Sequence, residues 1–267
     1  MKYLLSFVLA ATAVLSAQET DRVTVPLSNP SRPATVRVDL MNGNIDVKAH
    51  NGKDVVVEMS GGGSNSRRSS RRPAEVDGLK RVDVFSTGLD VEERENVIQI
   101  GTGPRSQNTS VTVLVPQSTS LKLKTMTGKV SVDGVKGEVE ANSMNGAVSI
   151  TNVEGSVVAH SLNGKVIVSL AKIDGNKAMS FSTMNGDIDV TMPGDTKANV
   201  RLKNDHGEVW TDFEMKLQTT PKVESGRESD GRYRVKFERT VTGTINGGGP
   251  DMSFTTMNGQ IRLRKAK

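Results

Sequence analysis

The chain has 267 residues, of which 35% are hydrophobic and only 3% aromatic, and it contains no cysteine. The lack of cysteine excludes a disulfide framework and a lipid anchor on an N-terminal cysteine. Lysine and arginine outnumber aspartate and glutamate by 35 to 30, so the formal net charge is +5 and the expected surface is mixed, with a mild basic bias.

The first 17 residues have the pattern of a secretory signal peptide. Lys2 supplies a positive charge, an apolar run follows, and small residues end it before Gln18. This run is too short to span a bilayer, and later segments are no better suited, so we expect no membrane-spanning segment. The prediction is export to the periplasm, the cell surface or the medium. Residues 18–34 are expected to form a lead-in segment that caps the first repeat.

From residue 35 onward one short pattern recurs, in which a strand of alternating character ends at an Asn-Gly corner. The copies are LMNG at 40–43, TMTG at 125–128, SMNG at 143–146, SLNG at 161–164, TMNG at 183–186 and TMNG at 256–259, with NDHG at 204–207 as a degenerate copy. Glycines at 128, 137, 146, 155 and 164 are nine residues apart, which indicates a unit of eighteen residues with two strands and two turns.

Units of equal length with equivalent residues at equivalent positions favour coils stacked on one another rather than a chain of hairpins. Glycine suits tight turns with positive φ at the corners. Leu121, Leu123 and Thr125 share one face of their strand, whereas Lys122 lies on the other. The sequence therefore predicts an all-β, single-stranded β-solenoid of two sheets over residues 35–267, with about 18–22 residues per coil.

Two polar segments interrupt the repeat, at residues 61–75 and 221–231. The first is expected to be a flexible insertion, and it contains a basic cluster of Arg67, Arg68, Arg71 and Arg72. This cluster is a candidate for peripheral contact with an anionic envelope surface, and a solvated loop is the alternative. Nucleic acid is not an expected partner, because export separates the protein from the nucleic acid of the cell and aromatic stacking groups are scarce.

Methionine recurs at the position before Asn-Gly, and this column is the most unusual candidate site. Its members are Met41, Met126, Met144, Met184 and Met257, with Leu162 in the remaining copy. One interpretation is an exposed, adaptable apolar stripe that contacts a partner. The other is a stack of corner residues that covers the edge of the core. The asparagines beside it, Asn42, Asn145, Asn163, Asn185 and Asn258, are expected to form a turn ladder bonded to neighbouring backbone.

The sequence contains no arrangement typical of a catalytic, cofactor or metal site. The three histidines, His50, His160 and His206, have no paired spacing. Two carboxylate pairs, Asp187 with Asp189 and Glu138 with Glu140, lie at strand spacing on the predicted outward face, where they should be solvated rather than share a cleft. The glycine run at 247–249 occurs once and lacks the period of a calcium-binding repeat.

The repeated Asn-Gly-x-Ile/Val-x-Val units, the opening stretch 35–47 and the closing stretch 243–263 resemble a bacterial putative-adhesin domain of unknown function. That family is a β-strand-repeat group of exported or envelope proteins, and the resemblance covers about residues 35–267. It implies a β-solenoid at the cell envelope and an adhesin role, and it implies no catalytic residues.

The resulting functional hypothesis is an exported, non-enzymatic, adhesin-like binding module of the cell envelope, without cofactor, whose partner is an unidentified envelope glycan or protein. One alternative is a structural or regulatory envelope component that acts through protein contacts, which an uncapped solenoid end after Leu263 would favour. Another is a carbohydrate-active β-helix enzyme. The scarcity of aromatic residues, with Trp210 as the single tryptophan, argues against it.

Overall fold

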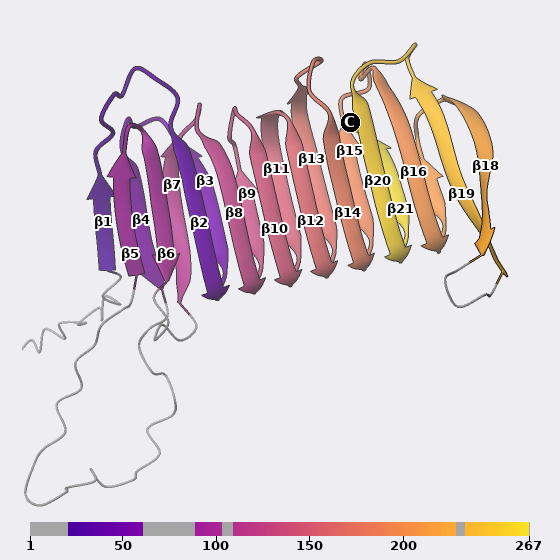
Figure 1. Cartoon of the computed structure of the whole chain (residues 1–267). Helices are drawn as coiled ribbons and strands as arrows, with labels where there is room; N and C mark the ends of the chain where they lie inside the picture. Colours follow the sequence, from indigo (N-terminus) through magenta and orange to yellow (C-terminus); the bar gives the residue numbers. More distant parts are fainter. Residues whose placement is uncertain (1–20, 61–88, 103–108, 228–232, 267) are drawn as a thin grey trace, which may run out of the picture.

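The computed structural model describes residues 21–60, 89–102, 109–227 and 233–266. These ranges form a rod of stacked β-coils, in which two sheets face each other across one core (Figure 1). The expected signal peptide and the basic cluster, Arg67, Arg68, Arg71 and Arg72, lie outside the described residues.

Within the described ranges, sheet A has ten strands in the order β1-β4-β7-β3-β9-β11-β13-β15-β21-β17. Their bounds are β1 Asp21–Val25, β3 Ile45–His50, β4 Val55–Ser60, β7 Ser110–Pro116, β9 Val130–Asp133, β11 Val148–Gly155, β13 Val166–Ile173, β15 Ile188–Met192, β17 Val209–Thr211 and β21 Ile261–Lys265.

Sheet B has eleven strands in the same described ranges, in the order β18-β19-β16-β20-β14-β12-β10-β8-β2-β6-β5. Their bounds are β2 Thr35–Asn42, β5 Leu89–Arg94, β6 Val97–Thr102, β8 Ser120–Thr127, β10 Val139–Asn145, β12 Val157–Asn163, β14 Met179–Asn185, β16 Ala198–His206, β18 Met215–Arg227, β19 Tyr233–Ile245 and β20 Asp251–Asn258.

The coils in the middle of the rod are parallel and in register, as the eighteen-residue unit predicts. Val139 of β10 pairs with Leu121 of β8 on one side and with Val157 of β12 on the other. Alternation along each strand then sends every second side chain into the core, so that Leu121, Leu123 and Thr125 are buried. Both the predicted two-sheet β-solenoid and this predicted parity are confirmed.

The stacking order departs from chain order at both ends, contrary to the expectation that each coil stacks on the one before it. The first coil, β2 and β3, lies between the coil of β6 and β7 and that of β8 and β9. The last coil, β20 and β21, lies between the coil of β14 and β15 and that of β16 and β17. Leu263 is therefore inside sheet A, paired on both sides, so it does not form the uncapped solenoid end that would favour a structural component.

Large inward side chains explain the position of the last coil. Phe254 of β20 pairs with Phe181 of β14 and with Leu202 of β16, and the two phenylalanine rings stack with centroids 5.0 Å apart. Both rings are fully buried. Such a ring pair contributes about 0.5–1.5 kcal/mol beyond its buried area. Insertion of β20 thus places two phenylalanines and a leucine, one from each of three coils, in one layer of the core.

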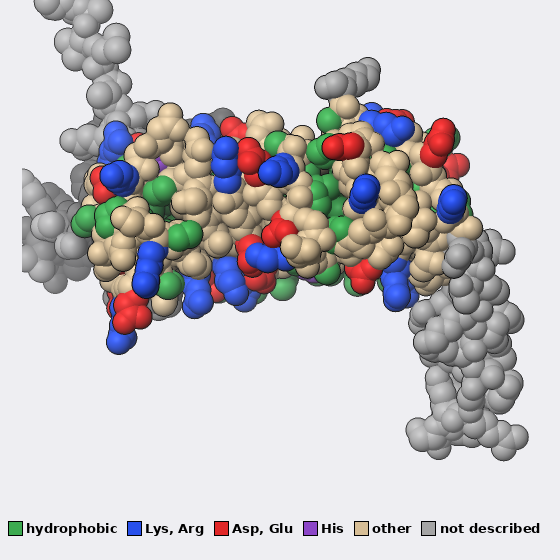
Figure 2. All heavy atoms as spheres, turned by 90° about the horizontal axis from the view of Figure 1, so that it is seen from above, with side chains coloured by type: hydrophobic (Ala, Val, Ile, Leu, Met, Phe, Trp, Pro, Cys, Tyr) green, Lys and Arg blue, Asp and Glu red, His purple; other side chains and the backbone are tan. Residues whose placement is uncertain are grey.

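Antiparallel strands end both sheets at one end of the rod and sheet B at the other, where sheet A ends in the parallel strand β17. At one end β5 pairs with β6, β4 pairs with β7, and β1, which lies in the expected lead-in segment, pairs with β4. At the other end β19 pairs with β16, and β18 pairs with β19 as a long hairpin that contains residues 221–227 of the second polar segment. Seen from the edge in Figure 2, acidic and basic side chains are interspersed along the rod, as expected from the composition.

Candidate functional site

The Asn-Gly corners lie in a row along one edge of the rod, where β2, β8, β10, β12, β14 and β20 end (lower edge of Figure 1). Their backbone groups bond to the next coil rather than across a hairpin. The Gly146 N–H donates to the Asn163 carbonyl and the Gly164 N–H to the Asn185 carbonyl, each at 3.1 Å. The turn signal in the sequence is therefore a corner of the solenoid, continuous with the sheet ladder.

Glycine is required at these corners because neighbouring coils approach closely. A Cβ on Gly146 would lie 2.0 Å from the Gly128 carbonyl oxygen, and a Cβ on Gly164 would lie 2.3 Å from that of Gly146. Neither Gly146 nor Gly164 has a positive φ. The expected reason, a left-handed backbone, is thus wrong at these two corners, and contact with the adjacent coil replaces it.

A column of buried hydroxyl groups lines the inner side of the same edge. Each hydroxyl donates to the carbonyl of a corner glycine in the adjacent coil, at distances of 2.9–3.1 Å. The donors are Thr125, Ser143, Ser161, Thr183 and Thr256. The sequence shows these only as small inward residues. Their function as donors becomes visible once the glycine carbonyls are placed beside them.

The outer side of this edge carries the methionine column. We call Met41, Met126, Met144, Leu162, Met184 and Met257 the methionine ladder, because strand pairing aligns them across six adjacent strands of sheet B. The five methionines are 41–56% exposed, and Leu162 is half-buried. At a strand spacing of about 4.8 Å the ladder is roughly 24 Å long. Of the two sequence interpretations, this geometry favours the exposed stripe.

The asparagine column lies directly beside the methionine ladder. The Nδ2 groups of Asn163, Asn185 and Asn258 donate to the Oδ1 atoms of Asn145, Asn163 and Asn185, at 2.8–2.9 Å. The side chains therefore bond to one another, and the expectation that they bond to neighbouring backbone is wrong for these residues. This amide ladder holds the corner side chains in fixed positions next to the thioethers.

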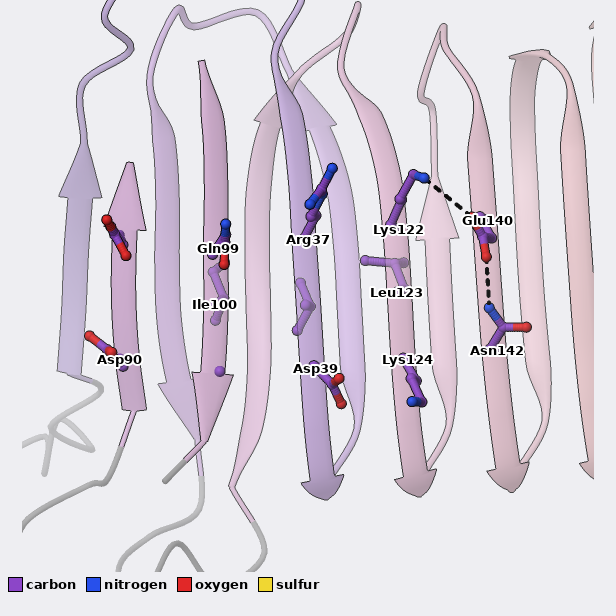
Figure 3. A pocket seen from close by; sticks show the side chains of 13 residues that line it. Arg37, Asp39, Asp90, Gln99, Ile100, Lys122, Leu123, Lys124, Glu140 and Asn142 are labelled. Atoms are coloured by element: carbon purple, nitrogen blue, oxygen red, sulfur yellow. Dashed lines mark hydrogen bonds and ion pairs between the residues drawn. The ribbon is translucent and has the colours of Figure 1, made fainter. Parts of the chain in front are cut away.

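The outer face of sheet B has a shallow polar hollow of about 420 Å³ over β5, β6, β2, β8 and β10 (Figure 3). Arg37 and Lys124 lie in it with Asp39 and Asp90. Nearby, Lys122 Nζ is 3.8 Å from a Glu140 carboxylate oxygen, and the other oxygen of that carboxylate accepts a bond from Asn142 Nδ2 at 3.3 Å. Charges of both signs on an open face suit polar contacts with a ligand.

The histidines are in separate surroundings. His50 Nδ1 accepts from the Gly52 N–H at 3.0 Å, His160 Nδ1 lies 2.8 Å from Ser182 Oγ, and His206 is exposed on β16. Among the described residues no group of three or more histidine, aspartate or glutamate side chains is placed to hold a metal ion.

The carboxylate pairs take part in ion pairs on the outer faces. Asp187 Oδ2 is 3.4 Å from Lys165 Nζ and 3.6 Å from an Arg262 nitrogen, and Asp189 Oδ1 accepts from Arg264 Nε at 2.9 Å. A hydrogen bond from the Gln260 backbone N–H lowers the pKa of Asp187, against a smaller opposing effect of burial. Glu138 pairs with Lys177, and this bond raises the pKa of that lysine.

The chain was compared with curated proteins and with solved structures. None of the curated proteins matches the chain. Two similar crystal structures are a putative cell adhesion protein from Clostridium sporogenes and a putative adhesin from Bacteroides fragilis. Both have 10% sequence identity and a TM-score of 0.43; they cover 93% and 94% of this chain, and it covers 100% and 98% of theirs.

Within the described ranges, no helix is long and apolar enough to cross a membrane.

The model of the Toastrack DUF4097 family matches residues 1–248, almost the whole chain. The protein therefore belongs to the Toastrack DUF4097 family, which confirms the resemblance to a β-strand-repeat domain of unknown function.

Proposed function

We propose that this protein is an exported, non-enzymatic binding module of the bacterial cell envelope, which contacts an envelope glycan or protein through the methionine ladder. The observation that carries the proposal is the exposure of five aligned methionines, 41–56% each, along one edge of a rigid rod. Scattered exposed apolar residues are ordinary on a protein surface, whereas an aligned stripe is typical of an interaction site.

The construction of the edge supports this function. The glycine contacts, the hydroxyl column and the amide ladder hold the backbone beneath the stripe, so little conformational entropy is lost there on binding. The methionine side chains, with three rotatable bonds and a polarisable sulfur, adapt to the shape of a partner. A rigid backbone with adaptable side chains suits adhesion to partner surfaces that differ in shape.

The surroundings of the titratable groups support a non-enzymatic function. Asp187 and Asp189 are in ion pairs on an open sheet face. His50 and His160 each bond locally. General acid–base or nucleophilic catalysis requires such groups to converge on one substrate position.

The second candidate is a structural envelope component that assembles with other proteins. The observation that favours it is the edge strand β17, Val209–Thr211, all three residues of which are exposed. An edge strand presents unpaired backbone groups to which an extended segment of a partner can add.

The test compares two triple variants at Met126, Met144 and Met184, one with leucine and one with serine. Leucine keeps an apolar stripe of similar volume, whereas serine removes it. Binding of labelled protein is measured on whole cells, on purified peptidoglycan and in pull-downs from envelope extract. We expect saturable binding, weakened about tenfold by serine and less than about threefold by leucine.

Both variants should keep the circular dichroism spectrum and melting temperature of the wild type, because the positions are exposed. Unchanged binding by a folded serine variant would contradict the proposal. Capture of a single protein with no retention on cells or peptidoglycan would instead support the second candidate. N-terminal sequencing of the protein from an envelope fraction tests export, with a mature end expected near Gln18.

A further inference from the structure

Trp210, the single tryptophan of the chain, lies on a strand of sheet A, whereas the methionine ladder lies at the ends of strands of sheet B. It belongs to β17 at the edge of sheet A and pairs with Arg262 of β21. The residue is 57% exposed. A side chain of this size gains substantially when it is covered, so its exposure on the described surface indicates a contact that the isolated chain leaves open.

A hollow of about 390 Å³ surrounds this indole, and its other side chains are mostly polar. Asp212 extends from the same segment as Trp210, and Gln260, Arg262 and Arg264 come from β21 and the corner before it. Leu263, the one other large apolar residue in the lining, points into the core and is 1% exposed. The accessible part of the hollow is thus one flat aromatic ring framed by hydrogen-bonding groups.

The polar frame is held in place by its own contacts. Arg264 Nε donates to both oxygens of Asp189, at 2.9 and 3.2 Å, and Arg262 is bonded to Gln260 and lies 3.6 Å from Asp187. Asp212 accepts from the Lys265 backbone N–H at 3.3 Å. Groups that are fixed before a ligand arrives lose less entropy on binding.

Charge in and around the hollow is balanced. The two guanidinium groups are paired with Asp187 and Asp189, and the pKa of Asp187 is lowered, first by the hydrogen bond from the Gln260 N–H and further by Lys165 and Arg262. The site therefore offers directed N–H donors and carboxylate acceptors without a large net charge. It is suited to a neutral polar ligand better than to a polyanion.

We propose that Trp210 and its polar neighbours form a saccharide-binding subsite. A pyranose ring has an apolar face of C–H bonds and a rim of hydroxyl groups that both donate and accept. Its C–H face would lie on the indole, while its hydroxyls bond to Asp212, Gln260 and the free N–H groups of Arg262. This inference goes beyond the proposed function, because it assigns a second surface and the chemical class of its ligand.

The composition of the hollow favours a sugar over a protein segment. Tryptophan at the centre of a protein interface is usually ringed by contacts that exclude water and pack tightly, with apolar neighbours at the core. Here Asp212, Gln260 and Arg262 take those positions. An open, shallow site of this kind should bind one sugar unit weakly, with a Kd of about 0.1–1 mM.

The test uses intrinsic fluorescence, which reports on this site alone because the chain has no second tryptophan. The full chain without its first 17 residues is titrated with chitotetraose, cellotetraose and soluble peptidoglycan glycan strands. We expect a saturable change in tryptophan emission with at least one of them. Heparin and an unstructured apolar peptide serve as probes for a polyanion site and for a peptide site.

Variants decide whether the indole itself makes the contact. Trp210→Ala should weaken saccharide binding about tenfold or more by calorimetry, and Gln260→Ala about threefold, both with unchanged melting temperature. Leu217→Ala is the matched control, since Leu217 is also 57% exposed but lies on β18 outside the hollow. The serine variant of the methionine ladder should titrate like the wild type, which separates this site from the proposed function.

Three outcomes would overturn the subsite. One is the absence of a saturable signal with all three saccharides up to about 10 mM. Another is undiminished calorimetric binding by Trp210→Ala. The third is a saturable response to the peptide or to heparin in place of the sugars.

Discussion

The two long edges of the rod are formed by the same strands, yet only one of them is regular. On the Asn-Gly edge, methionine, asparagine and glycine occupy the same columns in successive coils, and Gly146 contacts the Gly128 carbonyl so closely that a Cβ does not fit. The opposite edge is mixed: a Cβ on Gly155 would lie 2.3 Å from the Gly137 carbonyl oxygen, whereas a Cβ on Gly175, in a longer loop, would have no atom within 4 Å. Glycine thus recurs where the backbones of neighbouring coils touch, throughout the Asn-Gly edge and in part of the opposite one, and the repeat is lost in the longer loops of the opposite edge.

The largest loss of stability should come from a substitution that places a Cβ in the close contact between Gly146 and the Gly128 carbonyl. Gly146→Ala places a methyl group 2.0 Å from the Gly128 carbonyl oxygen, which already accepts from Ser143 Oγ, so the two coils must separate. We expect the free energy of unfolding to fall by about 3 kcal/mol or more, measured by urea denaturation.

Gly175→Ala on the opposite edge is the matched control. It should change stability by less than about 0.5 kcal/mol, or raise it slightly by restricting the unfolded chain. Equal urea midpoints for Gly146→Ala and Gly175→Ala would mean that the close contact at Gly146 does not restrict substitution. That result would contradict the expected difference between the two positions.

The regular edge is also the part of the fold that the sequence predicts best. Its period of eighteen residues and the parity of Leu121 and Leu123 are local patterns, and both are confirmed. The insertion of the last coil is not local, because a period does not specify which coils are neighbours. A signal does exist in hindsight: Met252 and Phe254 repeat the inward pair Met179 and Phe181, beside which they stack.

The same reasoning explains what could be predicted of the candidate sites. The methionine ladder follows from one repeated position, so the sequence identifies its members, and only their exposure requires the structure. The hollow around Trp210 joins two segments about 50 residues apart through the pairing of β17 with β21. Because that pairing exists only through the insertion of the last coil, the sequence shows Trp210 as an isolated aromatic residue.

An intermediate effect is expected inside the regular edge. Ser161→Ala removes the hydroxyl that donates to the Gly146 carbonyl at 2.9 Å, and it leaves that partly buried oxygen one partner short. The expected loss is about 1–2 kcal/mol in the free energy of unfolding. Ser161→Thr should be tolerated, because Thr183 makes the equivalent bond in the next coil. Ser180→Ala, on the outer face of sheet B, is the control and should be nearly neutral.

A smaller effect is expected on the outer side of that edge. Asn163→Ala removes the amide that donates to Asn145 and accepts from Asn185, in a partly solvated position. We expect a loss of about 0.5–1 kcal/mol by thermal or urea denaturation. Asn176→Ala, in a loop of the opposite edge, should cost less. A larger cost at Asn176 than at Asn163 would mean that the amide ladder contributes nothing specific to this edge.

The smallest effect concerns Asp187, which follows a corner glycine and joins the regular edge to the hollow. Its pKa is lowered in the folded state from 3.8, chiefly by the Gln260 N–H, so its contribution to stability is complete above that value and is lost as pH falls through the folded pKa. Asp187→Asn should therefore flatten the dependence of unfolding free energy on pH below about pH 4, by less than about 1 kcal/mol. An unchanged slope would contradict this.

Asp187→Asn also separates stability from ligand binding. At pH 7 the variant keeps an oxygen to accept from the Gln260 N–H, but it loses the charge that lies 3.6 Å from Arg262. A weaker saccharide affinity at nearly unchanged stability is the expected result, because Arg262 would then be positioned less firmly beside Trp210. A parallel loss of saccharide affinity and of unfolding free energy would contradict this separation. It would mean that the Asp187 carboxylate stabilises the corner and the hollow together, instead of positioning Arg262 alone.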